Sequence, residues 1–224
     1  MANVVAVFNE NVAEYDRWFD ENPQVYEAEL EAVRRYLPRQ GRGLEIGVGT
    51  GRFAAPLGVA VGVDPAPNMV AAARARGIRT YQAYGEALPF AHASFDYVLM
   101  VTVDPFVRDL ARVLSEARRV LTVGGHLVVG MIDRESDLGR AYEANKGADK
   151  FYRHATFHSV QEMVEHLQQA GFSVVGACQT ILGRLQGALE TGHVEVAFLP
   201  NAFAVHEGYG QGAFVVIDAR KLST

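Results

Sequence analysis

Apolar side chains recur at helical spacing over the first part of the chain. Between about residue 9 and residue 37 they return every three or four positions, with an interruption at Asn22-Pro23. This spacing predicts two amphipathic helices. The stretch "LPRQGRG" ends the second helix because proline and glycine interrupt helical structure. We therefore expect an N-terminal helical cap over residues 1–38.

Beyond the cap, short apolar runs alternate with helical patterns. The runs predicted to be strands are Leu44–Ile46, Val59–Asp64, "IRTYQA", Phe95–Val101, "GGHLVVGMID", "FSVVGACQTIL" and "GAFVVIDAR". Helices are expected from Arg52, from Asn68 to Arg76 and from about Arg108 to Val120. Alternation of this length predicts βαβ units, and therefore an α/β fold with a mostly parallel sheet covered by helices on both faces.

One segment interrupts this alternation. Residues 134–158 follow the fifth predicted strand, and we interpret them as an insertion or lid. After it, Ser159 and Glu162 form a capping-box pattern that opens a helix, and Gly171 closes that helix. With 224 residues the chain suits one domain, residues 1–224, in which residues 159–224 complete the sheet.

The composition narrows the class of protein. The formal net charge is −5 at pH 7, so nothing indicates a nucleic-acid partner. Cys178 is the only cysteine, which excludes an internal disulfide framework and a cysteine-rich metal site. No apolar run approaches the roughly 20 residues of a membrane span, and the N-terminus lacks the basic stretch of a signal peptide. We expect a cytoplasmic protein without a membrane partner.

The stretch "LEIGVGTGRF" is the strongest candidate for a ligand site. It places Gly47, Gly49 and Gly51 after a predicted strand and before a helix, at the edge where α/β sheets bind ligands. The spacing differs from the dinucleotide pattern G-x-G-x-x-G because Arg52 stands where a small residue is needed, and no P-loop lysine follows. Asp64 ends the next strand, where a carboxylate can accept hydrogen bonds from both hydroxyls of a ribose. These features together favour a nucleoside-binding site over a simple turn.

The chain resembles a known enzyme family in four successive stretches, "LEIGVGTGRF", "GVDPAPNMVAAARARG", "GEALPFAHASFDYVLMV" and "EARRVLTVGGHLVVGMIDRES". They look like the motifs of class I S-adenosylmethionine-dependent methyltransferases, in the small-molecule branch that includes the ubiquinone and menaquinone C-methyltransferases. The whole chain is similar to small prokaryotic proteins of this fold. The resemblance implies a Rossmann-like sheet of seven strands and a cofactor-binding core over residues 39–133. It also implies methyl transfer from S-adenosyl-L-methionine to a small-molecule acceptor, with S-adenosyl-L-homocysteine as product.

The resemblance also implies a set of cofactor contacts. Glu45 and the glycine loop would border the methionine part, Asp64 would take the ribose hydroxyls, and Met69 would pack on the adenine. The full set is Glu45, Gly47, Gly49, Thr50, Gly51, Asp64, Pro65, Met69, Glu86, Ala87, Val101 and Thr102. One departure is that Tyr84 stands two residues before Glu86, where the family often has an acid that bonds the adenine amino group. Tyr84 or a backbone carbonyl can replace that acid, and Glu86 can instead cap the loop.

The sequence assigns no catalytic residue. Methyl transfer from a sulfonium is an in-line displacement with a good leaving group, so the protein mainly aligns the acceptor and excludes water. A base is needed only for an acceptor that is protonated at the working pH. His154 and His158 can serve, although surface or capping roles also explain them, and they lack a third ligand, so no metal site is expected. The stretch "VDPF" is similar to the Asp/Asn-Pro-Pro-aromatic motif of amino-group methyltransferases, but it has one proline and reads better as a turn.

The acceptor pocket is expected between the N-terminal helices and the insertion. Tyr15 and Trp18 belong to an aromatic stripe that core packing also explains, and in similar methyltransferases the Tyr15-Asp16 position lies on a helix over the cofactor. The insertion mixes aromatic and basic residues, which suits an anionic or aromatic acceptor, or a solvated lid. The candidate acceptor contacts are Tyr15, Trp18, Phe106, Arg134, Tyr142 and His154.

The residues leave three other functions open. A cofactor-binding sensor or partner subunit without turnover would need the same glycine loop and Asp64. An aminopropyltransferase would need an acidic polyamine pocket, for which Asp104 alone is thin support. A dehydrogenase is disfavoured by the glycine spacing, and the oligomeric state is not fixed by the sequence.

Overall fold

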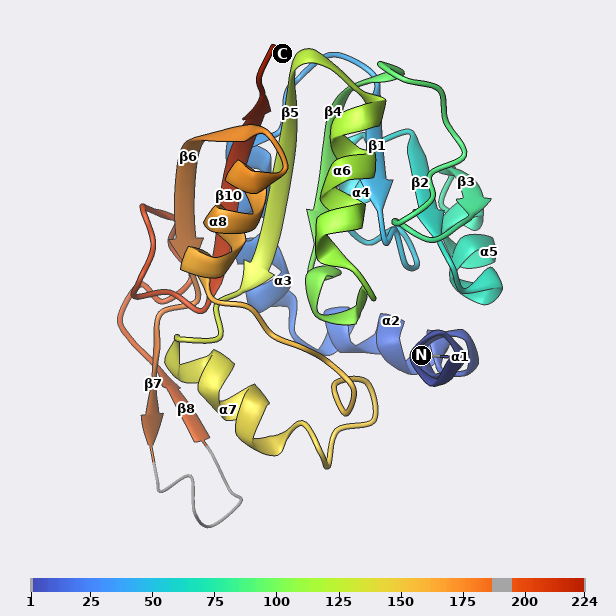
Figure 1. Cartoon of the computed structure of the whole chain (residues 1–224). Coiled ribbons are helices and arrows are strands. Elements are labelled where there is room, and N and C mark those ends of the chain that lie inside the picture. The colour runs from blue at the N-terminus through green and yellow to red at the C-terminus, as the bar shows by residue number, and fades with distance from the viewer. Residues whose placement is uncertain (1, 187–194, 224) are drawn as a thin grey trace.

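A mostly parallel sheet forms the centre of the molecule (Figure 1). The computed structural model describes residues 2–186 and 195–223, so residues 1, 187–194 and 224 of the predicted domain lie outside it. Within the described part, one sheet has the order β3-β2-β1-β4-β5-β10-β6-β9, and β7 pairs with β8 separately. The strands are β1 (Gly43–Ile46), β2 (Val61–Asp64), β3 (Arg79–Gln82), β4 (Phe95–Val101), β5 (Leu121–Ile132), β6 (Phe172–Thr180), β7 (Gly183–Gln186), β8 (Glu195–Phe198), β9 (His206–Glu207) and β10 (Phe214–Lys221). The predicted Rossmann-like class is confirmed, and the two-residue β9 adds an eighth strand beside the seven predicted ones.

The strand order shows where a ligand can bind. The strands β1 to β5 pair in parallel, while β10 runs antiparallel between β5 and β6. The order reverses at β1, because β2 and β3 lie on one side of it and β4 and β5 on the other. At such a switch point the loops diverge and leave a crevice outside the carboxyl ends of the strands. The loops after β1, β2 and β4 are therefore the expected position of a site.

Two apolar layers bury the sheet, and β4 contributes to both. Val98 and Met100 pack in the layer that includes α6 (Leu110–Val120) and α8 (Val160–Gln169). Leu99 and Val101 pack in the opposite layer with α3 (Pro23–Tyr36) and α4 (Ala54–Leu57). In Figure 1, α6 and α8 cover the near face and α3 lies behind the sheet. A strand buried on both faces reads as a continuous apolar run, which is why this strand was predicted to the residue.

The N-terminal part contains one helix more than predicted. The helix α1 (Ala2–Glu10) precedes α2 (Val12–Glu21), and α3 begins at Pro23, as the interruption at Asn22-Pro23 predicted. Its valines give α1 a low intrinsic helix propensity, and tertiary contacts hold it in place. Asn68, at the start of α5 (Pro67–Ala75), donates two hydrogen bonds of 2.9 Å to Asn9 from its backbone and side-chain nitrogens. The helices α1 and α2 lie below the carboxyl ends of β1 and β4 in Figure 1.

The insertion after β5 contains a helix that the sequence analysis did not predict. The helix α7 (Asp137–Asn145) begins after Ser136, whose hydroxyl accepts the Gly139 N–H. Tyr142 of this helix and Tyr152 beyond it pack against the buried ring of Phe157. The capping box predicted for the next helix is present in α8. The insertion is thus an ordered wall rather than a solvated loop.

The strand β5 is longer than predicted. It begins at Leu121, three residues before the Gly-Gly pair that opens the predicted run. Gly124 has φ of 75°, and the pairing of β4 with β5 shifts register between Phe95 and Tyr97. The glycines therefore bend the strand within the ladder and do not end it.

Candidate active site

The glycine loop after β1 forms a tight turn at the edge of the sheet. Gly47, Gly49 and Gly51 have φ values of 71°, 51° and 85°, a conformation that glycine adopts without steric cost. A Cβ at Gly47 would lie 2.3 Å from Val103, and a side chain also fills the space at Gly51. A Cβ at Gly49 would first meet the Tyr15 hydroxyl, at 3.3 Å. Gly49 is therefore the glycine of this loop where a Cβ would make the longest contact, a tight one with a side chain of the cavity wall.

Asp64 supports this loop from the tip of β2. One carboxylate oxygen accepts the Gly49 N–H at 3.0 Å, and the other accepts the Ala66 N–H at 2.9 Å. Burial raises the pKa of Asp64 to about 6, although these two hydrogen bonds act in the opposite direction. Each carboxylate oxygen can accept more than one hydrogen bond. Asp64 can thus hold the loop and still accept hydroxyl donors from a ligand.

Glu45, on β1, is buried with an unpaired oxygen. Its side chain is 2% exposed, and Oε2 has no hydrogen-bond partner among the described residues. Burial raises the pKa of Glu45 well above its ordinary value; the Ala54 N–H lowers it in part, and the charge of Asp64 raises it further. An unsatisfied buried polar atom costs free energy. A ligand that brought a donor to this oxygen would remove that cost.

A cavity of about 570 Å³ opens beside the loop, a size typical of small-molecule sites, which span roughly 300–1,000 Å³. Of the predicted cofactor contacts, it is lined by Gly47, Gly49, Asp64, Pro65, Met69, Glu86, Val101 and Thr102, whereas Glu45, Thr50, Gly51 and Ala87 do not line it. Of the predicted acceptor contacts, it is lined by Tyr15, Trp18, Phe106 and Tyr142, whereas Arg134 and His154 do not line it. The structure therefore brings most residues of both sets to one cavity.

The loop after β3 forms the side of the cavity predicted to hold adenine. Met69 is buried and lines the cavity. The Glu86 carboxylate accepts the Arg108 N–H at 2.8 Å, which supports the loop-capping interpretation of this residue. The Tyr84 ring is 44% exposed, lines the cavity and lies 5.2 Å from the Arg108 guanidinium carbon. The Ala87 N–H donates to the Tyr84 carbonyl at 3.1 Å, within the loop itself.

Two β-branched residues of the cavity wall have unfavourable backbone conformations. Thr102, at the end of β4, has φ of 48°, and Ile181, after β6, has φ of 61°. Both line the cavity. Positive φ is a genuine outlier for β-branched side chains, and such strain concentrates at functional sites. The hydrogen bond of 2.8 Å from the Thr102 N–H to the Gly130 carbonyl helps to hold the strained turn.

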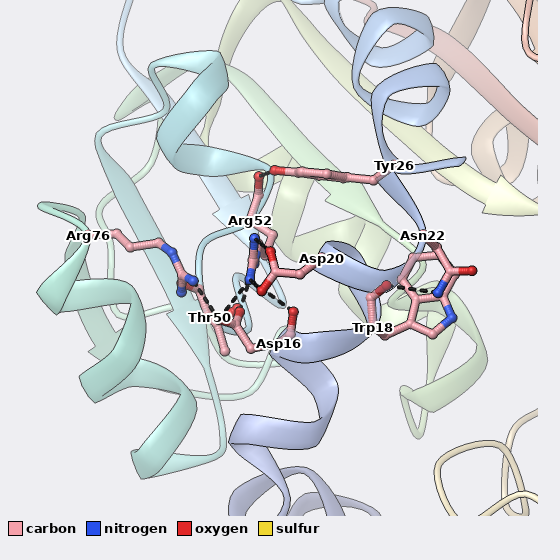
Figure 2. A network of polar contacts seen from close by, with 8 residues as sticks. All are labelled: Asp16, Trp18, Asp20, Asn22, Tyr26, Thr50, Arg52 and Arg76. Carbon is pink, nitrogen blue, oxygen red and sulfur yellow. Dashed lines mark hydrogen bonds and ion pairs between the residues drawn. The ribbon is translucent and has the colours of Figure 1, made fainter. Parts of the chain in front are cut away.

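A polar network clamps α2 onto the glycine loop (Figure 2). Asp16 accepts hydrogen bonds from the Thr50 hydroxyl at 2.7 Å, from Arg52 at 2.8 Å and from Arg76 at 2.6 Å. Arg52 also pairs with Asp20 at 2.9 Å. Partial burial by itself would raise the pKa of Asp16, but the hydrogen bonds from Arg52, Thr50 and Arg76 outweigh it and lower the pKa to about 2. The helix over the cavity is therefore fixed to the loop beneath it.

Six aromatic rings form one part of the cavity wall. We call this part the aromatic chamber; its rings belong to Phe8, Tyr15, Phe106, Tyr142, Phe151 and Tyr152. The Phe8 and Phe106 centroids lie 5.0 Å apart, those of Phe106 and Tyr152 5.8 Å, and those of Tyr142 and Tyr152 5.0 Å. These rings come from α1, α2, the turn after β4 and the insertion. The cap and the insertion together thus form the wall of the chamber.

The basic residues of the insertion do not face this chamber. Arg134 donates to Glu162 at 2.8 Å, and Lys146 pairs with Glu143 at 2.6 Å. His154 is exposed. The sequence could not show these pairings, and its mixture of aromatic and basic residues therefore suited an anionic or aromatic acceptor. In the structure, aromatic residues of the insertion line the cavity, whereas Arg134, Lys146 and His154 do not.

The "VDPF" stretch forms a turn that anchors the insertion. Residues Asp104–Phe106 make a single turn of 3-10 helix, and Phe106 points its ring into the chamber. Asp104 is buried and lies 3.2 Å from Nδ1 of His158, while the Pro105 carbonyl accepts the Thr156 N–H at 2.9 Å. The turn thus holds the two ends of the wall together. Across residues 2–186 and 195–223, no group of three or more His, Cys, Asp or Glu residues could hold a metal ion.

Several residues of the cavity wall were not found from the sequence. They include Phe8, Glu29, Phe151 and Phe214. Glu29 carried a usable signal, because it lies on α3 four residues after Val25 and four before Val33, on the apolar stripe of that helix. An acid at a core position of an amphipathic helix is an exception to the pattern. The other three are aromatic residues that read as ordinary core positions.

The comparisons with known proteins agree with this geometry. Residues 44–129 match the family described as "Methyltransferase domain". One similar protein of known crystal structure is an S-adenosylmethionine-dependent methyltransferase of Thermotoga maritima, described as a possible histamine N-methyltransferase. Its sequence is 44% identical to this chain, and the two structures have a TM-score of 0.86. The match covers 96% of this chain and 99% of the T. maritima chain. This chain belongs to the S-adenosylmethionine-dependent methyltransferases. Its cofactor is S-adenosylmethionine.

Two further relatives of this methyltransferase show how far the likeness reaches. An uncharacterized protein of Methanocaldococcus jannaschii is 44% identical over 216 residues, 96% of this chain and 99% of the relative. A demethylmenaquinone methyltransferase of Thermus thermophilus is 40% identical over 98 residues, which is 38% of this chain and 44% of the relative. The methyltransferase has, within its described residues, no helix with the length and apolar character that crossing a bilayer requires.

Proposed function

We propose that this methyltransferase transfers a methyl group from S-adenosylmethionine to a small molecule bound in the aromatic chamber. The observation that carries the proposal is the shared cavity, which is lined by the glycine loop and Asp64 and also by the rings of the chamber. A cofactor in the loop and an acceptor in the chamber would then be neighbours. The T. maritima relative described as a possible histamine N-methyltransferase supports an acceptor of small size.

The cofactor end of the cavity fits S-adenosylmethionine. Gly49 leaves space for a ligand next to the backbone, and Asp64 keeps acceptor positions free for ribose hydroxyls. The unpaired oxygen of Glu45 would accept a hydrogen bond from the amino group of the methionine part. Met69 would pack on the adenine. When bound, the cofactor supplies an electrophilic methyl group on a positively charged sulfur.

The chain contributes mainly alignment and exclusion of water. The network from Asp16 to Arg52 holds α2 over the loop, so that Tyr15 faces both the loop and the chamber. The aromatic rings restrict the position of an acceptor and keep the cavity apolar. Correct alignment in a dry site supplies much of the acceleration of a displacement reaction. Thr50, Gly51 and Ala87 lie outside the lining and would act on the cofactor through the loop.

The structure lends less support to the alternatives. The likeness to the menaquinone enzyme is confined to 38% of the chain, so it does not identify a quinone acceptor. Asp104, the residue that suggested an aminopropyltransferase, is paired with His158 and does not line the cavity. A sensor without turnover would have no use for an enclosed acceptor chamber. Methyl transfer to a small molecule is therefore the proposal that uses the whole cavity.

Calorimetry tests the cofactor, and a methyl-transfer assay then tests the acceptor. We expect S-adenosylhomocysteine to bind with a dissociation constant in the micromolar range, about −8 kcal/mol, and NAD to bind far more weakly. Incubation with methyl-labelled S-adenosylmethionine and fractionated cell extract should then label a small-molecule fraction. Binding of NAD as tightly as S-adenosylhomocysteine would refute the cofactor assignment, and label found only in protein or nucleic acid would refute the small-molecule acceptor.

A further inference from the structure

The side of the aromatic chamber formed by α3 contains a carboxyl group that the methyl-transfer machinery described so far does not use. Glu29 lines the cavity, is 7% exposed, and makes no hydrogen bond or ion pair with any other residue of the described ranges. A buried carboxylate without a partner is strongly unfavourable. Burial raises the pKa of Glu29 to about 8. Because Glu29 lines the cavity, a ligand bound there can reach this carboxyl group.

The position of Glu29 relative to the cofactor end follows from its effect on the tyrosines. Its charge raises the pKa values of Tyr15, Tyr142 and Tyr152, after the larger effect of burial, so all three lie within electrostatic reach of it. Tyr15 is reached by the charge of Asp64 as well. Glu29 therefore lies near three tyrosines of the chamber, one of which, Tyr15, is also near Asp64.

The charge of the whole wall favours a cation. The described residues that line the cavity include the acids Glu14, Glu21, Glu29, Asp64, Glu86 and Asp149, but only the bases Arg17 and Arg108. Both arginines are exposed, at the rim. Lys150 is occupied by Glu14, and Arg134 and Lys146 have partners outside the cavity. Glu14, Glu21 and Asp149 are exposed like the two arginines, so the charged lining residues that are not exposed are Glu29, Asp64 and Glu86, all acidic. Away from the rim, an anionic acceptor would meet like charge, whereas a cationic one would meet opposite charge and aromatic faces.

Resting on the proposed methyl transfer, we infer that the acceptor is an amine, and that Glu29 binds its ammonium group and takes up its proton. The rings of Tyr15, Tyr142 and Tyr152 add to this site because aromatic faces attract cations, most strongly where water is excluded. A hydrogen-bonded ion pair between ammonium and carboxylate also satisfies a group that is otherwise orphaned. The inference names a recognition residue that the glycine loop and the family motifs do not contain.

The same residue solves the protonation problem of an amine acceptor. An ammonium nitrogen has no free electron pair, so it must lose a proton before it can react. In the free protein the raised pKa keeps a proton on Glu29, and the arriving ammonium displaces this proton to solvent, so that the bound pair is ammonium and carboxylate. Transfer of the ammonium proton to Glu29 then replaces two charges by two neutral groups, which burial favours. The amine nitrogen then forms the new N–C bond with its lone pair, and the C–S bond breaks with its electron pair going to sulfur. The methylated ammonium product carries one proton fewer than the starting ammonium, and Glu29 holds that proton until solvent removes it.

A binding experiment with matched probes tests the inference without relying on turnover. The probes are butylamine and 2-phenylethylamine, each compared with the alcohol and the carboxylate of the same skeleton, titrated into protein loaded with S-adenosylhomocysteine. We expect at least one amine to bind about tenfold tighter than its alcohol, and the carboxylate to bind weakest. Glu29→Gln should remove this preference for the amine and lower its affinity about tenfold. Glu27→Gln, at an exposed position of the same helix, should behave as wild type.

Failure of this inference can be separated from failure of the proposed function. If Glu29→Gln binds S-adenosylhomocysteine within about twofold of wild type, the cofactor end is intact and any loss of amine binding belongs to Glu29. The inference is overturned if no amine binds the loaded protein, if the alcohol or carboxylate binds as tightly as the amine, or if Glu29→Gln keeps the preference. If the wild-type protein does not bind S-adenosylhomocysteine, the proposed function itself is overturned. Labelled methyl transfer to the bound amine, but not to its alcohol, would give an independent confirmation.

Discussion

At the scale of single residues, Gly49 and Gly58 separate the effect of ligand approach from that of backbone strain. Both have positive φ, 51° and 73°. A Cβ at Gly58 would meet nothing within 4 Å, whereas one at Gly49 would project toward Tyr15 at the cavity. An alanine at either position carries the cost of a left-handed backbone, about 1–2 kcal/mol. Only the alanine at Gly49 would also obstruct a ligand.

We predict that Gly49→Ala lowers the affinity for S-adenosylhomocysteine about tenfold, or about 1.4 kcal/mol, in protein that remains folded. Gly58→Ala should lose similar stability and keep wild-type affinity. Gly51→Ala should lose more stability than either, because its Cβ would lie 2.4 Å from Ile78. Calorimetry and thermal unfolding on the same preparations measure both quantities. A folded Gly49→Ala variant with wild-type affinity would show that this loop is not where the cofactor binds.

Asp64 should make cofactor binding depend on pH. Its pKa is raised to about 6 by burial, so it is ionised at neutral pH and becomes protonated as the pH falls through that value. The neutral form is a weaker acceptor for ribose hydroxyls. Tyr15 and Glu45 lie close to it, and burial raises the pKa of both.

We predict that the affinity of wild type for S-adenosylhomocysteine falls up to about tenfold between about pH 7 and pH 5, as one proton is taken up by the free site. Asp64→Asn should bind weakly at both pH values and show no such fall. Calorimetric titrations across this range provide the measurement. A flat profile for wild type, together with unchanged affinity of Asp64→Asn, would assign Asp64 only to support of the loop.

At the scale of elements, the clamp between α2 and the glycine loop connects the cap to the sheet. Arg52 is the central residue of this clamp, because its one side chain, from the loop, binds both Asp16 and Asp20 on the helix. The Arg52 side chain is 16% exposed, so its ion pairs are screened less than surface pairs. By contrast, the pair of Arg34 with Glu31 is largely exposed and should contribute little.

We predict that Arg52→Ala loosens α2 while leaving the sheet folded. Hydrogen exchange should rise over residues 12–21, and the affinity for S-adenosylhomocysteine should fall by up to about 1.5–3 kcal/mol, the range for hydrogen bonds to charged groups. Arg34→Ala is the matched control and should leave both unchanged. Equal exchange of α2 in the two variants would mean that apolar packing alone holds the cap.

At the scale of the whole molecule, the sequence predicted the frame of the fold better than the walls of its site. Strands such as β4 are continuous apolar runs, and the glycine loop and Asp64 are adjacent to strands in the sequence, so local pattern was sufficient for them. The cavity wall is assembled from α1, α3 and the insertion, which are far apart in the chain. Local pattern therefore missed α1 and Glu29. It also could not show that Arg134 is paired with Glu162 and faces away from the cavity.

The buried position of Glu29 has a consequence for how well the protein can resist unfolding. In the unfolded chain this acid has an ordinary pKa near 4.5, whereas in the folded protein burial raises the pKa to about 8. Between these values the folded state binds the proton and the unfolded state does not, so the group lowers stability as the pH rises through this window, by at most about 1.4 kcal/mol for each pH unit. Tyr15, Tyr142 and Tyr152, which face it, have raised pKa values and do not titrate there.

We therefore predict that the melting temperature of Glu29→Gln exceeds that of wild type by a margin that grows from about pH 5 to pH 8. Glu27→Gln should show no such margin. A melting temperature of Glu29→Gln at or below that of wild type at pH 8 would contradict this prediction. If Glu29→Gln is more stable than wild type and has lost amine binding, then Glu29 serves binding at a cost in stability. The stability of the wild type is then not the highest that its fold allows.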